Sequence, residues 1–425
     1  MRPANEIYLH AMNSISPKSH RRLRVVFCLL MLVGAFAFIT GILGPHPQRA
    51  WQTYLVNFVF WTGLCFGSVL FSAILTITNA RWGRPLKRLA EAAAAFLPVS
   101  FVLFWIIFLG RKEIFHWIHE PIPEKVAWLN VPFLFARDAA GLLALTILSM
   151  AIVYFSVKRD MDSAAGHTAK LQLDGDGRDW YERILVVLSP LYGILYALVL
   201  SLIAFDLIMS LSPHWYSTLF GAAYFIGSLY TGLAALMIFA GIAVKGLKLG
   251  RYIHPHQFHN LGKLILGFCL MTGDFFFTQF FVIWYGNLPE ETRYVILRTR
   301  SVTWESLAWT VLIVCFALPF VVLLSRRIKM KPVAMMILSS VILAGMWLER
   351  FLLVAPSIWH GQSLPLGMSE ILISAGFIGT IALCILTFVQ RFPILPVADP
   401  LFRAYLTTTT GRNQWRPETG AGVAG

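Results

Sequence analysis

The chain has 425 residues, of which 57% are hydrophobic and only 13% are charged. Soluble domains carry about 25% charged residues, so this composition excludes a soluble globular protein and indicates an integral membrane protein. The net charge of +14 is spread over many loops and forms no patch, which argues against a nucleic-acid-binding surface. The five cysteines show no CxxC or CxxCH spacing, so the chain encodes neither an iron–sulfur cluster nor covalently attached c-type haem.

Ten apolar stretches are long enough to cross a bilayer, which takes about 20 residues. We expect helices at 24–43, 53–77, 88–109, 132–157, 184–210, 218–244, 261–285, 304–325, 333–354 and 367–389. This pattern predicts an all-α integral membrane protein with a transmembrane domain at 24–390. A cytoplasmic segment at 1–23 precedes it, and a cytoplasmic tail at 391–425 follows, which we expect to be disordered beyond about Leu406. We expect no cleaved signal peptide, because the first apolar stretch lacks a small-residue cleavage site.

The basic residues set the orientation of these helices. Most of the 35 Lys and Arg residues lie before the first span or in every second loop after it. The positive-inside rule therefore predicts that both termini face the cytoplasm. Trp51, Trp215 and Trp284 then belong to an aromatic belt at the outer interface. The Gly63–Gly67 step in the second span is a GxxxG spacing that predicts close helix packing.

Ionisable residues inside the spans are informative, because each is costly unless it is paired or hydrated. They are Arg137, Asp138, Asp206, Asp274, Glu305, Glu349 and Arg350. All but Asp274 belong to the outer half of the bilayer, which favours an outward-facing polar cavity or a proton path. The alternative is interhelical ion pairing, with the two arginines neutralising the nearby acids. Glu305 is expected to be a solvated residue at a helix start.

Two of these acids, Asp206 and Asp274, and the histidines need separate consideration. Asp206 lies one turn before the end of its span, and the polar turn after it carries His214. This histidine either shuttles protons near Asp206 or caps the next helix. Asp274, the deepest acid, is expected to hydrogen-bond to Thr278 or Gln279. None of the 11 histidines lies deep in a span, so we expect no b-type haem with two histidine ligands. The run HPHQFH at 254–259 is expected to be a solvated loop, although it could bind a metal.

The stretch AFDLIMSLSPHWYSTLFGAAYFIGS at 204–228 resembles the NrfD/PsrC-like membrane subunits of alternative complex III, in particular the ActF-like subunit. Stretches at 54–98, 259–292 and 347–357 resemble the same subunit, so the resemblance covers most of residues 50–400. It implies two four-helix bundles, helices 2–5 and helices 6–9, flanked by helices 1 and 10. The chain departs from the family pattern where it has Thr272 and Asp274 in place of an aromatic pair. It departs again where it has Met346 and Glu349 in place of a His and an Asp.

The resemblance implies a membrane subunit of a quinol:cytochrome c oxidoreductase in a bacterial inner membrane, which is not an enzyme alone. Such a subunit borders a quinone site or provides a proton path. The electrons of quinol pass to iron–sulfur and c-type haem groups on partner subunits. The resemblance also implies a larger NrfD-like membrane subunit as a partner. Buried carboxyl groups such as Asp206 and Asp138 would then accept protons from quinol. Two alternatives stay open, which are a secondary transporter and a purely structural anchor of the complex.

Overall fold

The computed structural model describes residues 17–166, 171, 172, 178–247, 249–361 and 363–414, and this part of the chain is helical throughout its regular elements. Ten of its helical segments are long and apolar enough to cross a membrane. In chain order they are α2 (Pro17–Ile42), α3 (Pro47–Ile77), α4–η1–α5 (Arg84–Leu109), α7 (Val131–Ala164), α8–η5–η6 (Trp180–Leu211), α9 (Leu219–Lys245), α10 (Pro255–Gly286), α12–η8–α13 (Glu305–Leu324), α15 (Pro332–Ile358) and α16 (Met368–Arg391). Short helices α6 (Arg111–Ile114), α11 (Pro289–Thr299) and α14 (Arg326–Lys329) connect them, and α17 (Pro400–Gln414) follows.

The predicted all-α membrane architecture with ten spans is confirmed. Several helices extend beyond the predicted stretches, because hydropathy marks only the part that needs an apolar surrounding. The second span begins at Pro47 and the seventh at Pro255, about two turns earlier than the apolar stretches indicate. In the tail, α17 continues past Leu406 to Gln414. Residues 1–16 of the predicted cytoplasmic segment at 1–23, and the part of the predicted tail after residue 414, lie outside the described residues.

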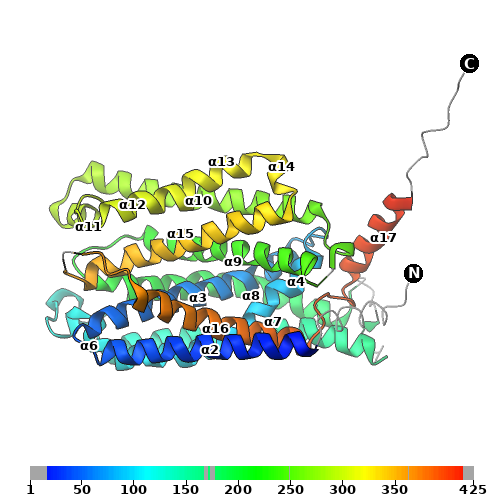
Figure 1. The fold of residues 1–425 in the computed structure, drawn as a ribbon, viewed down its shortest axis with the longest axis horizontal. Coiled ribbons are helices and arrows are strands. Elements are labelled where there is room, and N and C mark those ends of the chain that lie inside the picture. The colour runs from blue at the N-terminus through cyan, green and yellow to red at the C-terminus, as the bar shows by residue number, and fades with distance from the viewer. Residues whose placement is uncertain (1–16, 167–170, 173–177, 248, 362, 415–425) are drawn as a thin grey trace, which may run out of the picture.

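The long helices run side by side along the longest axis of the molecule (Figure 1). Helices α6 and α11 lie at one end, which we call the outer end in keeping with the predicted orientation. The start of α2 and the whole of α17 lie at the opposite, inner end (Figure 1). Because the number of spans is even, the start of the first span and the end of the last span lie at the same end of the molecule.

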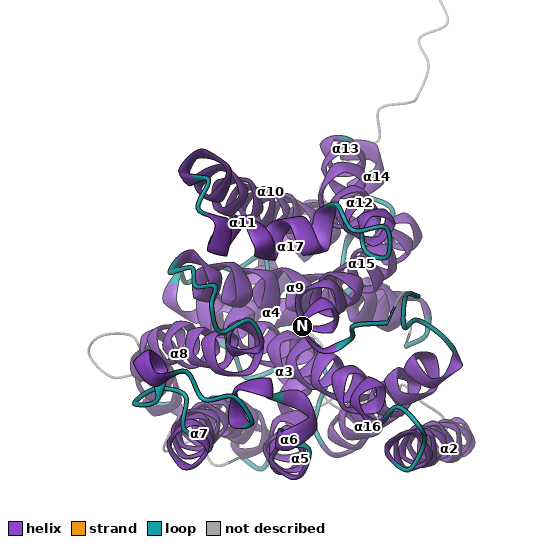
Figure 2. Ribbon diagram, turned by 90° about the vertical axis from the view of Figure 1, so that its left-hand side faces the viewer, coloured by secondary structure: helices purple, strands orange, loops and turns teal. Residues whose placement is uncertain are grey.

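Helices α3 and α9 form the centre of the molecule, as an end-on view shows (Figure 2). They approach closely because glycines face each other across the interface. A Cβ atom on Gly67 would lie 2.3 Å from the carbonyl oxygen of Ser228, and one on Gly232 would lie 2.6 Å from the amide nitrogen of Ser68. The GxxxG step predicted from the sequence therefore sits in this central contact.

Around this centre the spans form two groups. Helices α5, α7 and α8 lie on one side with α3, and α10, α12 and α15 lie on the other side with α9 (Figure 2). We call these groups the first bundle and the second bundle. Helices α2 and α16 pack against each other at the flank, where Gly34 meets Gly376. The arrangement agrees with the two four-helix bundles and two flanking helices that the resemblance implies.

A buried ionic network closes the inner end of the first bundle. The guanidinium group of Arg88 on α4 donates to Glu91 at 2.6 Å and also to Asp160 on α7. Glu91 further accepts hydrogen bonds from Ser72 at 2.8 Å and from Ser156 at 2.9 Å. All five side chains are buried, so the network links α3, α4 and α7 inside the protein.

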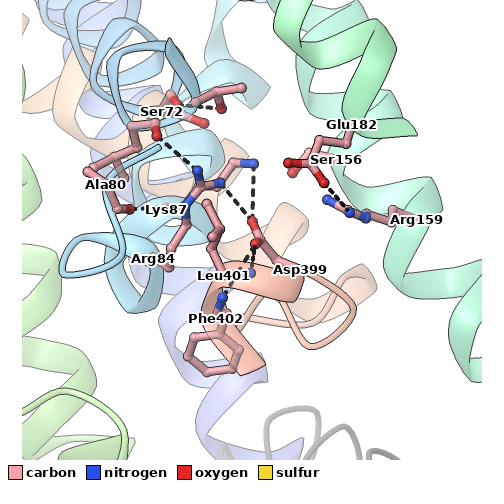
Figure 3. A network of polar contacts seen from close by, with 12 residues as sticks. Ser72, Ala80, Arg84, Lys87, Ser156, Arg159, Glu182, Asp399, Leu401 and Phe402 are labelled. Atoms are coloured by element: carbon pink, nitrogen blue, oxygen red, sulfur yellow. Dashed lines mark hydrogen bonds and ion pairs between the residues drawn. The ribbon is translucent and has the colours of Figure 1, made fainter. Parts of the chain in front are cut away.

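The C-terminal segment is part of this network (Figure 3). Asp399 accepts a hydrogen bond from Arg84 at 2.8 Å and lies 3.7 Å from the ammonium group of Lys87. The backbone nitrogen of Ala398 donates to Asp160 at 2.7 Å. Burial alone would raise the pKa of the Asp399 carboxyl group, but Lys87 and Arg84 more than offset this effect and hold the pKa at about 2. The tail is therefore fixed to the inner end by ionised groups.

Candidate functional site

A cavity of about 610 Å³ lies in the outer half of the second bundle, among α9, α10, α11, α12 and α15. Small-molecule sites in proteins have volumes of about 300–1,000 Å³ and mostly apolar walls with a few polar groups. This cavity has that character. Its walls are mainly aromatic and aliphatic, including Phe220, Phe276, Phe280, Ile283 and Leu352.

An ion pair on α15 forms part of the wall. The guanidinium group of Arg350 lies 3.1 Å from Oε1 and 3.0 Å from Oε2 of Glu349. Arg350 is buried, whereas the side chain of Glu349 keeps 24% of its surface exposed beside the cavity. Gly227 on α9 makes room for the arginine, since a Cβ there would lie 2.8 Å from Nη2 of Arg350. The pair is neutral overall, yet it presents a carboxylate to a mainly apolar space.

Helix α11 covers the outer end of the cavity and is held there by Arg298. Its guanidinium group donates to the carbonyl oxygen of Leu353 at 2.9 Å and to Oγ of Ser357 at 2.7 Å, both on α15. The guanidinium carbon also lies 3.5 Å from the ring centroid of Tyr294, whose other face stacks on Trp215 at 3.7 Å. Burial lowers the pKa of Arg298 and raises that of Tyr294. The sequence prediction missed Arg298 and Tyr294, because they lie between two apolar spans.

Asp274 lies on α10 and also lines the cavity. Its side chain is exposed, and among the described residues it forms the expected hydrogen bond with neither Thr278 nor Gln279. For Gln279 the spacing explains this result. Residues five positions apart do not share one face of a helix, whereas those three or four apart do. Gln279 instead donates to Oγ of Ser217 at 3.1 Å, in the turn before α9.

The cavity also gathers four positions at which the resemblance described above implies a departure from the pattern of the ActF-like subunits. Thr272, Asp274, Met346 and Glu349 all line it, although they come from two helices. These four positions therefore line one cavity and are not scattered over the fold.

A second polar cluster lies in the outer half of the first bundle. Arg137 on α7 donates to both carboxylate oxygens of Asp206, from Nε and from Nη2, each at 2.6 Å. The indole of Trp128 donates to the same carboxylate at 3.0 Å, and the guanidinium carbon lies 3.8 Å from the Trp128 ring centroid. Asp138 is buried beside Asp206. Asp206 stands on the π-helical turn η5 (Ala204–Ile208), a local distortion that often occurs at functional sites.

The predicted site residues thus separate into two groups with α9 between them. Asp274, Glu349 and Arg350 belong to the cavity, and Arg137, Asp138 and Asp206 belong to the cluster in the first bundle. Arg137 pairs with Asp206 on another helix, as the alternative of interhelical ion pairing predicts, whereas Arg350 pairs with its neighbour Glu349 on the same helix. The side chain of His214 is exposed in the outer turn, and Arg137 and Trp128 take up the carboxylate of Asp206. Glu305 is exposed in the first turn of α12, as expected.

Comparison with known proteins places this geometry in a family. A search of curated protein sequences found no match to the chain. The sequence model of the polysulphide reductase family NrfD matches residues 41–361, which include the cavity and both ion pairs. Members of this family are membrane subunits of quinol-linked redox complexes and associate with iron–sulfur subunits. The chain belongs to the NrfD polysulphide reductase family.

Proposed function

We propose that the chain is a quinol-binding membrane subunit of a quinol-oxidising electron-transfer complex, of the ActF-like type found in alternative complex III. The observation that carries the proposal is the apolar cavity with the Glu349–Arg350 pair in its wall. A quinol has an apolar ring and tail and two hydroxyl groups. An apolar space with few polar groups suits such a molecule better than it suits a soluble metabolite.

The residues of the cavity would divide the work between binding and proton acceptance. The aromatic walls would hold the ring, and Arg298 would keep α11 closed over it. Glu349 would accept a proton from a quinol hydroxyl, since it is an acid within an apolar space, and Arg350 would hold its carboxylate in place. Asp274 is a second acceptor on the opposite wall.

The electrons of quinol need a partner subunit, because amino-acid side chains such as these do not carry out hydride or one-electron chemistry alone. We assign that role to an iron–sulfur subunit and to c-type cytochrome subunits, with a larger NrfD-like membrane subunit beside this chain. The proposal places the complex in a bacterial inner membrane with both termini of the chain in the cytoplasm. The resemblance of residues 204–228 and the distribution of Lys and Arg support these assignments.

A cavity-filling substitution tests the proposal. Ala308 lines the cavity, and Ala308→Phe would place a ring in the space where quinol binds. Ala144→Phe is the matched control, because Ala144 is exposed on α7, away from the cavity. In the complex purified from native membranes, we expect Ala308→Phe to raise the KM for quinol at least about tenfold, which corresponds to about 1.4 kcal/mol of lost binding. The control should behave as the wild type. Equal KM values for all three complexes would mean that quinol does not bind in this cavity.

A further inference from the structure

Two carboxyl groups lie together in the outer half of the first bundle, but only one of them has a counter-charge. Asp206 is fully buried and Asp138 is 1% exposed. Asp206 receives two hydrogen bonds from Arg137 and one from Trp128. These three contacts balance its charge and satisfy its oxygens.

Asp138 has no such support. Its carboxyl group faces Asp206, yet both of its oxygens are buried and accept no hydrogen bond from the residues that the structure describes. The charged groups that face it are Asp206, from the neighbouring helix, and Arg137, from its own helix. The guanidinium group is already engaged by Asp206 and by the backbone oxygen of Trp128 at 3.1 Å.

The balance of charges determines whether the carboxyl group of Asp138 is protonated. One arginine facing two ionised carboxylates would leave a net negative charge inside the membrane, and a buried unpaired ion costs several kcal/mol. A proton on Asp138 removes that charge. It also supplies the donor that the pair lacks, because a protonated carboxyl group can donate a hydrogen bond to a carboxylate and two ionised ones cannot.

We infer that Asp138 and Asp206 hold a single exchangeable proton between them, so that this pair is a protonatable site in the outer leaflet, separate from the cavity. Arg137 fixes Asp206 in its ionised form, and Asp138 carries the proton. The cluster reaches the surface at the outer end, since Trp128 is 44% exposed and the side chain of Arg137 is 11% exposed. Release of the proton breaks the O–H bond of Asp138 and leaves the pair with two negative charges, and uptake of a proton restores it.

The inference goes beyond the proposed function, because it requires no quinol and concerns the other bundle. It gives the first bundle a chemical role, which is to store a proton on the outer side of the membrane. A purely structural ion pair would need Arg137 and Asp206 alone, and it would gain nothing from a second buried acid.

Infrared spectroscopy of the purified complex in H₂O and in D₂O tests the inference, because a protonated carboxyl group gives a C=O stretching band that shifts on deuteration. We expect Asp138→Asn to remove one such band from the wild-type spectrum at neutral pH. We expect Asp206→Asn to remove it as well, since Arg137 is then free to pair with Asp138, which becomes ionised. Asp399→Asn is the control, because Asp399 is buried but ionised, and it should leave the band unchanged.

Each outcome bears on the inference. Loss of the band in both Asp138→Asn and Asp206→Asn, but not in Asp399→Asn, would support a shared proton. A band that persists in Asp138→Asn would overturn it, and so would a band that persists in Asp206→Asn, since Asp138 would then be protonated without its partner. If Asp206→Asn fails to assemble, Asp138→Asn decides alone, because asparagine is neutral and nearly isosteric with the protonated acid.

Discussion

The close contact between α3 and α9 predicts a large effect of a small substitution, Gly67→Ala. The added Cβ atom would lie 2.3 Å from the carbonyl oxygen of Ser228, 2.8 Å from its carbonyl carbon and 2.9 Å from Cα of Leu229. Ordinary contacts of this kind begin at 3.4 Å, so the two helices would have to separate by about 1 Å. The obstructing atoms belong to backbone and cannot rotate away.

Overpacking of a well-packed interior costs about 1–3 kcal/mol, and the rigid obstruction places Gly67→Ala near the upper end of that range. We expect the unfolding temperature of the detergent-solubilised protein, followed by size-exclusion chromatography after heating, to fall by several degrees. Gly267→Ala is the matched control, because a Cβ at this position in α10 meets no atom within 4 Å. It should unfold at the same temperature as the wild type or higher, since alanine favours the helix by about 1 kcal/mol. If Gly67→Ala were as stable as Gly267→Ala, the central contact would be placed wrongly.

Three further predictions concern the inner network, the cover of the cavity and the proposed proton acceptor. Asp399→Asn should lower the free energy of unfolding by about 2 kcal/mol at pH 7, because the carboxyl pKa of about 2 in the folded protein lies below its unfolded value of about 3.9. This stabilisation is complete above the unfolded pKa and is lost as the pH falls toward 2. The unfolding temperatures of wild type and variant should therefore differ at pH 7 and converge at pH 2. A difference that stays constant with pH would refute the role of the ionised Asp399 carboxylate. Arg298→Gln should loosen α11 from α15, and we expect faster amide hydrogen exchange of residues 289–299 in the variant. Unchanged exchange would mean that the hydrogen bonds of Arg298 to Leu353 and Ser357 do not hold this helix. Glu349→Gln should lower kcat for quinol oxidation about 100-fold or more while changing KM little, because glutamine can hold a hydrogen bond but cannot take a proton; an unchanged kcat would remove Glu349 from the reaction.

The membrane architecture could be predicted from the sequence because the bilayer imposes a simple requirement. Each crossing needs about 20 apolar residues with all backbone groups bonded within the helix, so hydropathy alone locates the spans. It could not locate the helix ends, since residues such as Pro47 and Pro255 begin their helices outside the apolar stretches. Nor could it show that the tail is tied to the first bundle through Asp399.

The sequence could predict which residues belong to the candidate sites, but not which of these residues contact one another. Buried charges are rare enough in a span that Arg137, Asp206 and Glu349 stood out without a structure. Their grouping depended on helix packing, which brings Asp274 of α10 and Glu349 of α15 to the same cavity and leaves Asp206 in the other bundle. Arg298 gave no signal, because an arginine between two spans is ordinary in a membrane protein.

The inner network did leave a trace in the sequence. Arg84 precedes Lys87 by three residues and Arg88 by four, and Glu91 follows Arg88 by three residues and Lys87 by four, which places the four residues on one side of a helix. The positive-inside rule accounts for the three basic residues without any partner inside the protein. Only the fold shows that this face points inward, toward Asp160.

The most direct test of the central claim is purification of the chain from native membranes in a mild detergent, followed by addition of quinol while the spectrum is recorded. The account predicts that iron–sulfur and c-type cytochrome subunits copurify and that quinol reduces their haem. A colourless chain that purifies alone from several mild detergents would contradict the account. The secondary transporter would then become the leading alternative, to be tested by uptake into vesicles.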